Sequence, residues 1–170
     1  MKHTLHRLDT SLLLLARTGG HTSTRDRSVR RFSRLGEHAA IWLAIGAIGS
    51  ALSGGEPRRR WRRATALVAG TYGVNTALKL LVRRPRPRLA GLPPLTDTPT
   101  RYSFPSAHAS TSFAAARAFG RAGLPSAPLY ALAQAMALSR LYLGVHYPSD
   151  VLAGALLGSA IGALGAGPPP

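Results

Sequence analysis

Apolar and polar positions along the chain are segregated into long blocks. Residues 39–55, 64–78, 122–139 and 151–170 contain no Asp, Glu, Lys or Arg. A helix that crosses a bilayer needs about 20 mostly apolar residues. With their flanking residues, three blocks reach that length, and the second does so if it is extended through Lys79 to residue 82. A shorter block, 109–120, is assigned as a fifth span because its neighbours leave it no other place. The blocks predict an all-α integral membrane helical bundle of about five spans.

A bundle of soluble core helices is the alternative to membrane spans. Such helices need a polar stripe, and residues 41–51 and 151–165 show almost none. Gly154, Gly158 and Gly162 recur every fourth residue and therefore share one helix face. Faces of small residues let membrane helices approach closely. We interpret this face as packing within the bundle, with a homodimer contact as the alternative.

The N-terminal region has a different pattern. Residues 12–15 are all leucine, and Lys2 and Arg7 precede them. The run is too short for a signal-peptide core, and Asp9 interrupts its approach. We expect an interfacial amphipathic helix here, followed by a polar, basic connector over residues 21–36.

Charge is strongly unbalanced in this chain. Its 170 residues, a length typical of one domain, include 22 Lys+Arg and 6 Asp+Glu, for a net charge of +16. The arginines cluster at 25–34, before the first apolar block, and at 58–63 and 83–88, between later blocks. Such clusters suit contact with anionic membrane lipids. Nucleic acid is not expected as a partner, because no stacking platform or recognition motif accompanies the arginines.

Charged groups beside membrane spans are costly, so they are candidates for function. Here they gather in three segments: 79–87 at the end of the second span, 105–108 at the start of the third, and 139–150 between the fourth and fifth. With five spans, all three segments lie on one side of the membrane. They include the only two histidines between Lys79 and Asp150.

The basic side chains in these segments suit a phosphate group. Lys79, Arg86 and Arg140 offer a point charge and two planar forks that match phosphate oxygens. Ser106 stands where a helix begins, so its hydroxyl and the N–H groups after it would form an anion site.

Two histidines beside a bound phosphate predict a nucleophile and a general acid. Asp150 follows His146 by four residues, so its carboxylate would accept a hydrogen bond from one ring nitrogen and direct the other at phosphorus. His108 is the second histidine. The chain has no cysteine and no cluster of acidic residues, so we expect no metal and no cofactor. The arginines would supply the positive charge instead.

The three segments, in this order, closely resemble the signature of the type 2 phosphatidic acid phosphatase (PAP2) superfamily. The family pattern is Lys, six residues, Arg-Pro; then Pro-Ser-Gly-His; then Ser-Arg, five residues, His, three residues, Asp. The chain matches every fixed position from Lys79 to Asp150 except Ala107, which stands where glycine is usual. Alanine keeps the backbone N–H but loses the conformational freedom of glycine.

The resemblance implies a phosphatase with a covalent intermediate. His146 would be the nucleophile that forms a phosphohistidine, with Asp150 orienting it. His108 would protonate the leaving alkoxide and later activate water. The phosphoryl oxygens would be held by Lys79, Arg86, Ser106, Arg140 and the Ala107 amide. The expected domains are 1–37 as interfacial helix and basic connector, 38–166 as the PAP2-like transmembrane catalytic domain, and 167–170 as a proline-rich tail.

The resemblance also implies a lipid phosphate substrate at the plasma membrane. The chain is similar to the small bacterial branch of the family, some members of which act on polyprenyl-linked sugar phosphates such as decaprenylphosphoryl-5-phosphoribose. We favour a polyprenyl-type lipid phosphate, with undecaprenyl diphosphate or phosphatidylglycerol phosphate as alternatives. A basic, membrane-anchored binding protein is the non-enzymatic alternative.

The sidedness of the active site stays open at this point. In the five-span arrangement its face carries 13 basic residues and the opposite face 7, which favours the cytoplasm. Bacterial members of the family, however, commonly face outward. A homo-oligomer is compatible with the sequence.

Overall fold

The computed structural model describes residues 2–164, so the predicted proline-rich tail, 167–170, lies outside the described residues. This part of the chain is helical and contains no strand beyond two isolated bridges, which confirms the all-α class. The helices are α1 (Lys2–Thr18), α2 (Ser23–Arg34), the 3-10 helix η1 (Glu37–Ala39), α3 (Ala40–Leu52), α4 (Gly55–Val82), α5 (Ala107–Ala122), α6 (Ser126–Tyr142) and α7 (Pro148–Leu164).

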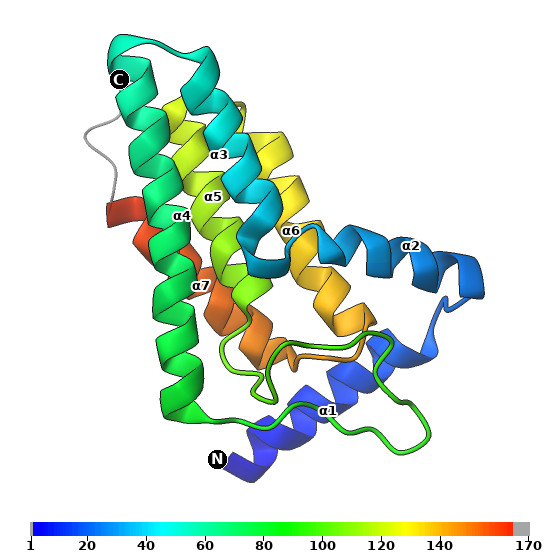
Figure 1. The fold of residues 1–170 in the computed structure, drawn as a ribbon. Coiled ribbons are helices and arrows are strands. Elements are labelled where there is room, and N and C mark those ends of the chain that lie inside the picture. The colour runs from blue at the N-terminus through cyan, green and yellow to red at the C-terminus, as the bar shows by residue number, and fades with distance from the viewer. Residues whose placement is uncertain (1, 165–170) are drawn as a thin grey trace.

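Helices α3 to α7 form a bundle around α5 (Figure 1). α5 packs against all four of the others, and most of its side chains are buried. They are largely alanine and serine, which lets neighbouring helices approach. Larger side chains fill the core beside it: Trp42 and Phe119 are fully buried, and the rings of Trp61 and Phe119 lie 5.3 Å apart.

The glycine face of α7 packs on α5 of the same chain. A methyl group at Gly154 would lie 2.5 Å from the carbonyl oxygen of Ser106, and one at Gly158 would overlap with the carbonyl of Ser110. Gly162 is buried on the same face. The interpretation as packing within the bundle is therefore confirmed.

Within residues 2–164, a helix occupies most of each of the five segments predicted as spans, but these helices differ in length. Among residues 2–164, α4 is the one single helix long and apolar enough to cross a membrane, and α2 with η1–α3 passes together as a pair bent by 50°. The other bundle helices have 13 to 17 residues, or about 20–26 Å at 1.5 Å per residue. A hydrocarbon core is about 30 Å thick. Helix length and composition therefore support one span directly, and a second if the bent pair is one span.

Helix α1 lies across one end of the bundle (Figure 1). It exposes Leu8, Leu12 and Leu15 and buries Asp9 and Leu13. It is thus amphipathic, as predicted, with an apolar surface on one side and a polar anchor on the other.

Helix α2 occupies the stretch expected to be a connector. Its N-cap is Thr22, whose hydroxyl accepts a hydrogen bond from the Arg25 N–H at 3.2 Å. Asp26 lies in its first turn, and Arg31 and Arg34 lie in its last. Both placements are favourable to the helix dipole. The sequence pattern does not predict this helix, because its residues are mostly hydrophilic and too few apolar side chains are present to show a helical period.

Replacing Gly158 by alanine should destabilise the bundle, because its new methyl group overlaps with the Ser110 carbonyl. We expect the free energy of unfolding to fall by about 1–3 kcal/mol, measured by thermal unfolding of the protein in detergent. Gly70→Ala is the matched control, since a methyl group there meets nothing within 4 Å. A Gly158→Ala protein as stable as the Gly70→Ala protein would contradict the close packing of α5 and α7.

Candidate active site

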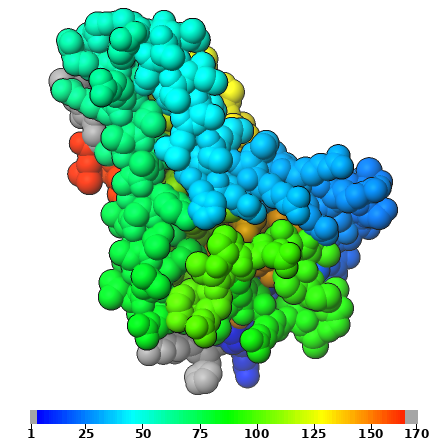
Figure 2. All heavy atoms as spheres, in the orientation of Figure 1, coloured from blue at the N-terminus to red at the C-terminus, as the bar shows by residue number. Residues whose placement is uncertain are grey.

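A cavity of about 100 Å³ lies at the end of the bundle where the loop after α4, the start of α5 and the turn between α6 and α7 meet. Figure 2 shows the loop after α4, in green, spread over this end of the molecule. We call this space the active-site cavity. Its lining is Glu37, His38, Tyr72, Thr76, Lys79, Leu80, Arg86, Pro99, Thr100, Tyr102, Ala107, His108, Arg140 and His146.

His146 is buried in the turn between α6 and α7. Its Nε2 lies 3.2 Å from Nη1 of Arg86, which can only donate, so Nε2 presents its lone pair. Nδ1 faces Oδ2 of Asp150 at 3.6 Å, longer than a hydrogen bond; catalytic hydrogen bonds are often long until substrate binds. Burial, followed by the charges of Arg86, Arg140 and Lys79, holds the pKa of His146 well below 6.5. The ring is therefore neutral at neutral pH.

Asp150 is fixed from several sides. Its Oδ2 accepts from the Tyr147 N–H at 2.8 Å, and its Oδ1 accepts from Nη1 of Arg84 at 2.8 Å. Nη2 of Arg84 donates to Asp9 on α1, also at 2.8 Å, and Asp9 accepts from the Ser149 N–H at 2.9 Å. Arg84 thus joins the N-terminal helix to the carboxylate beside His146.

Two cations of the cavity are held by backbone carbonyls. Nζ of Lys79 lies 3.3 Å from the carbonyl oxygens of both Tyr102 and Ser103. Nε of Arg86 donates to the Thr100 carbonyl at 2.8 Å. Burial lowers the pKa of Arg86 to about 10, so this side chain keeps its charge at neutral pH. Both groups therefore order the loop as well as charging the cavity.

The other histidine is held by the end of α2. Nε2 of His108 donates to the Ser33 carbonyl at 2.9 Å, so this nitrogen carries a proton and is engaged by the backbone. Nη1 of Arg140 donates to the Ser33 hydroxyl at 2.5 Å. Gly36 lies so close that a methyl group there would be 2.7 Å from Cδ2 of His108. One short segment of the N-terminal region therefore positions both His108 and Arg140.

The structure brings the three predicted segments together. Lys79, Arg86, Ala107, His108, Arg140 and His146 line the active-site cavity. Asp150 is buried behind His146. Ser106 is also buried, and its hydroxyl caps α5 by accepting from the Ala109 N–H at 3.5 Å; it is not among the lining residues.

Sequence reasoning missed the contribution of the N-terminal third. Glu37 and His38 line the cavity, with Nδ1 of His38 2.7 Å from the Tyr72 hydroxyl, and Asp9 and Ser33 support it. The rarity of acidic residues was a usable signal. Only six occur in the chain, so Asp9, next to the leucine-rich part of α1, and Glu37, directly before an apolar block, are both unusual positions for a carboxylate.

Among residues 2–164, no group of three or more His, Cys, Asp or Glu side chains is arranged to hold a metal ion. The positive charge of the cavity comes from Lys79, Arg86 and Arg140.

Comparison with known proteins agrees with the geometry. The PAP2 superfamily model matches residues 61–166. The chain is 44% identical over 138 residues to a protein of Mycobacterium tuberculosis named decaprenylphosphoryl-5-phosphoribose phosphatase, covering 81% of this chain and 76% of that one.

Solved structures share the fold. The crystal structure of Aquifex aeolicus LpxE has a TM-score of 0.78 at 24% identity, over 93% of this chain and 94% of that one. The transmembrane PAP2 type phosphatidylglycerolphosphate phosphatase of Bacillus subtilis has a TM-score of 0.69 at 23% identity, over 95% and 84%. With its three motifs gathered at one cavity and its family match extending over more than half of its length, the chain belongs to the PAP2 superfamily.

Proposed function

We propose that this protein is a membrane phosphatase that hydrolyses the phosphomonoester of a polyprenyl-linked sugar phosphate. The observation that carries the proposal is the environment of His146. His146 lines a cavity together with Lys79, Arg86 and Arg140, its Nε2 lone pair is directed at Nη1 of Arg86, and its other nitrogen faces a carboxylate. This arrangement suits a nucleophile next to a bound phosphate.

In the first step, Nε2 of His146 attacks phosphorus, and the bond from phosphorus to the alkoxide oxygen breaks. His108 gives the leaving oxygen a proton, so that an alcohol departs rather than an alkoxide. Asp150 stabilises the positive charge that develops on the His146 ring. Lys79, Arg86, Arg140 and the Ala107 amide bind the phosphoryl oxygens, which carry the charge of the transition state.

In the second step, His108 removes a proton from water, and the hydroxide attacks the phosphohistidine. The phosphorus–nitrogen bond breaks, inorganic phosphate is released, and neutral His146 and protonated His108 are regenerated. Ser106 contributes by fixing the start of α5, where Ala107 and His108 follow it directly.

The substrate assignment rests on the Mycobacterium tuberculosis relative. A decaprenylphosphoryl-5-phosphoribose lipid carries a phosphodiester between the prenyl chain and the sugar, and a phosphomonoester on the other end of the sugar. The monoester is the bond that a phosphatase hydrolyses, releasing inorganic phosphate. Undecaprenyl diphosphate and phosphatidylglycerol phosphate are the competing substrates.

We also propose that α3 to α7 each cross the membrane and that α1 lies in its interface. Large apolar side chains are exposed on α3, α4, α6 and α7, such as Leu52, Leu81, Leu138 and Leu156, but none on the central helix α5. A surface of this kind suits contact with lipid. The shorter helices would be accommodated by local thinning of the bilayer.

Phosphate release by the purified protein in detergent tests the proposed reaction. The substrates are a polyprenylphosphoryl pentose phosphate, undecaprenyl diphosphate, phosphatidylglycerol phosphate and phosphatidate, all with EDTA present. We expect release from the first, and a loss of at least about a thousandfold in kcat for His146→Ala because the nucleophile is removed. His21→Ala, a histidine outside the cavity, is the control. Activity that disappears in EDTA, or that survives in His146→Ala, would contradict the mechanism.

The pH dependence of kcat/KM provides a second test. Burial lowers the pKa of His146 below its ordinary value of 6.5, so the nucleophile stays unprotonated as the pH falls through 6.5. We expect the acid limb of kcat/KM against pH to have its midpoint below 6.5. The second ionisation of the substrate phosphate, near about pH 6, is measured by phosphorus NMR and divided out. A midpoint at or above 6.5 would mean that His146 is not held neutral.

Reporter fusions test the five-span arrangement. Alkaline phosphatase and green fluorescent protein are fused before α1, in the loop between α3 and α4, and after Pro170. We expect the first position on the side of the active site and the other two on the opposite side, because an odd number of spans separates the ends of the chain. A reporter after Pro170 on the side of the active site would rule out five spans.

A further inference from the structure

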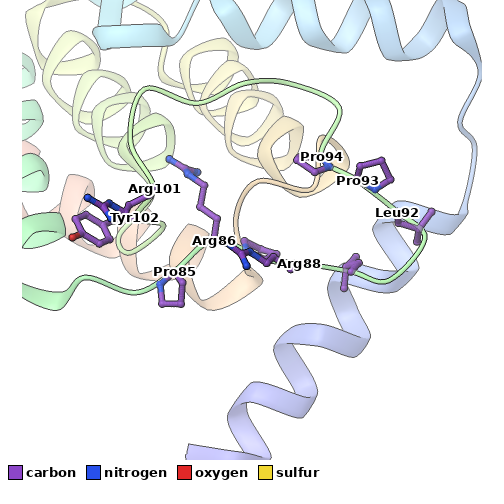
Figure 3. Close-up of a pocket in the computed structure, with 10 residues that line it drawn as sticks. Pro85, Arg86, Arg88, Leu92, Pro93, Pro94, Arg101 and Tyr102 are labelled. Atoms are coloured by element: carbon purple, nitrogen blue, oxygen red, sulfur yellow. The ribbon is translucent and has the colours of Figure 1, made fainter.

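A second pocket lies beside the active-site cavity, within the loop that joins α4 to α5 (Figure 3). Its volume is about 480 Å³, and we call it the loop pocket. It shares Arg86 and Tyr102 with the active-site cavity, so the two spaces meet at these side chains. Its lining includes four prolines together with Arg86, Arg88, Leu89, Leu92, Arg101 and Tyr102.

Contacts with the rest of the protein hold the loop in shape. Nη2 of Arg17 on α1 donates to the Pro93 carbonyl at 2.8 Å. The Leu95 N–H donates to the Leu143 carbonyl at 3.0 Å. The prolines restrict the backbone further, because each fixes its own φ. The loop pocket therefore belongs to a loop that is tied to α1 and to the end of α6.

The charge of the loop pocket is entirely positive. Arg86, Arg88 and Arg101 line it and no carboxylate does. Within the described residues, Arg88 and Arg101 form no ion pair, and both are exposed. The Arg101 guanidinium lies 5.7 Å from the Tyr102 ring. Guanidinium groups without an acidic partner favour an anion with planar or tetrahedral oxygens.

We propose that the loop pocket binds a second anionic group of the substrate, a phosphodiester, while the scissile monoester occupies the active-site cavity. The inference rests on the proposed function. Arg86 lies between the two spaces, so it contacts the scissile group from one side and limits how close the second anion can approach. Leu89 and Leu92 offer apolar surface to the chain esterified to that diester.

This arrangement selects substrates by the separation of two charges. A sugar between the two phosphates separates them by several bonds, whereas in a diphosphate a single oxygen joins them. Arg88 and Arg101 therefore favour a sugar-linked pair and contribute little to a diphosphate, both phosphates of which lie within reach of Lys79, Arg86 and Arg140.

The test compares two soluble substrates in a non-ionic detergent. One is a short-chain alkylphosphoryl pentose 5-phosphate, which has both anions; the other is an alkyl pentoside 5-phosphate, in which the diester is replaced by a neutral glycosidic bond. In the Arg88→Gln/Arg101→Gln protein, we expect KM to rise about tenfold for the first substrate, as for the loss of two partly exposed ion pairs. We expect kcat for both substrates, and KM for the second, to stay unchanged.

Arg31→Gln is the matched control. This arginine on α2 is also exposed and does not line the loop pocket, so its loss should leave both KM values unchanged. Equal KM changes for the two substrates, or none, would overturn the inference.

Two additional arms distinguish diester binding from contact with membrane lipid and from failure of the proposed reaction. If KM rises only in micelles that contain phosphatidylglycerol, and equally for both substrates, the arginines bind lipid headgroups of the membrane and the inference is overturned.

Direct binding of a short-chain alkylphosphoryl pentose, which has the diester but no monoester, is measured without turnover. Binding that is about tenfold weaker in the double variant would support the loop pocket even if neither substrate is hydrolysed, an outcome that would refute the proposed function instead.

Discussion

Lys79, Arg86 and Arg140 line one cavity. The free-energy cost of holding these basic groups together, largely out of water, constrains how this end of the bundle is built. Removing a charge from water costs several kcal/mol even after relaxation, and three like charges add their repulsion. Glu37 is the one acidic residue among those that line the cavity. Asp150 is the one carboxylate within 4 Å of the His146 ring among the described residues, and it is already bonded to Arg84. A phosphate would provide the balancing negative charge. The site is thus organised for an anion by the charges that it already holds.

Backbone carbonyl oxygens stabilise two of these basic side chains. The carbonyls of Tyr102, Ser103 and Thr100 accept from Lys79 and Arg86, which requires a backbone with unpaired carbonyls. A regular helix has none to spare along its length, so this part of the chain is a long loop. Nη2 of Arg17 on α1 donates to the Pro93 carbonyl of this loop, so the N-terminal helix helps to hold it.

Close helix packing fixes the distance between the motifs. Because Gly154 and Gly158 allow α7 to approach the backbone of α5, the Ser106 N–H reaches the Asp150 carbonyl at 3.0 Å. This bond links the start of the helix that carries His108 to the start of the helix that follows His146. The small-residue face of α7, which begins directly beside Ser106, therefore helps to set the relative position of the two histidines.

The sequence by itself determined the helical class, the position of the five bundle helices and the motif residues from Lys79 to Asp150. Long uncharged blocks and fixed motif spacing are local properties, so the sequence shows four of these helices and the motifs directly. The helix at 109–120, which carries Arg117, follows only from the position of its neighbours. The role of the N-terminal third was decided only by tertiary structure. Asp9, Ser33 and Glu37 lie more than 40 residues before the first motif, and nothing local relates them to it. Their partners are brought to them by the packing of α1 and α2 across the end of the bundle, a long-range arrangement that no short-range pattern encodes.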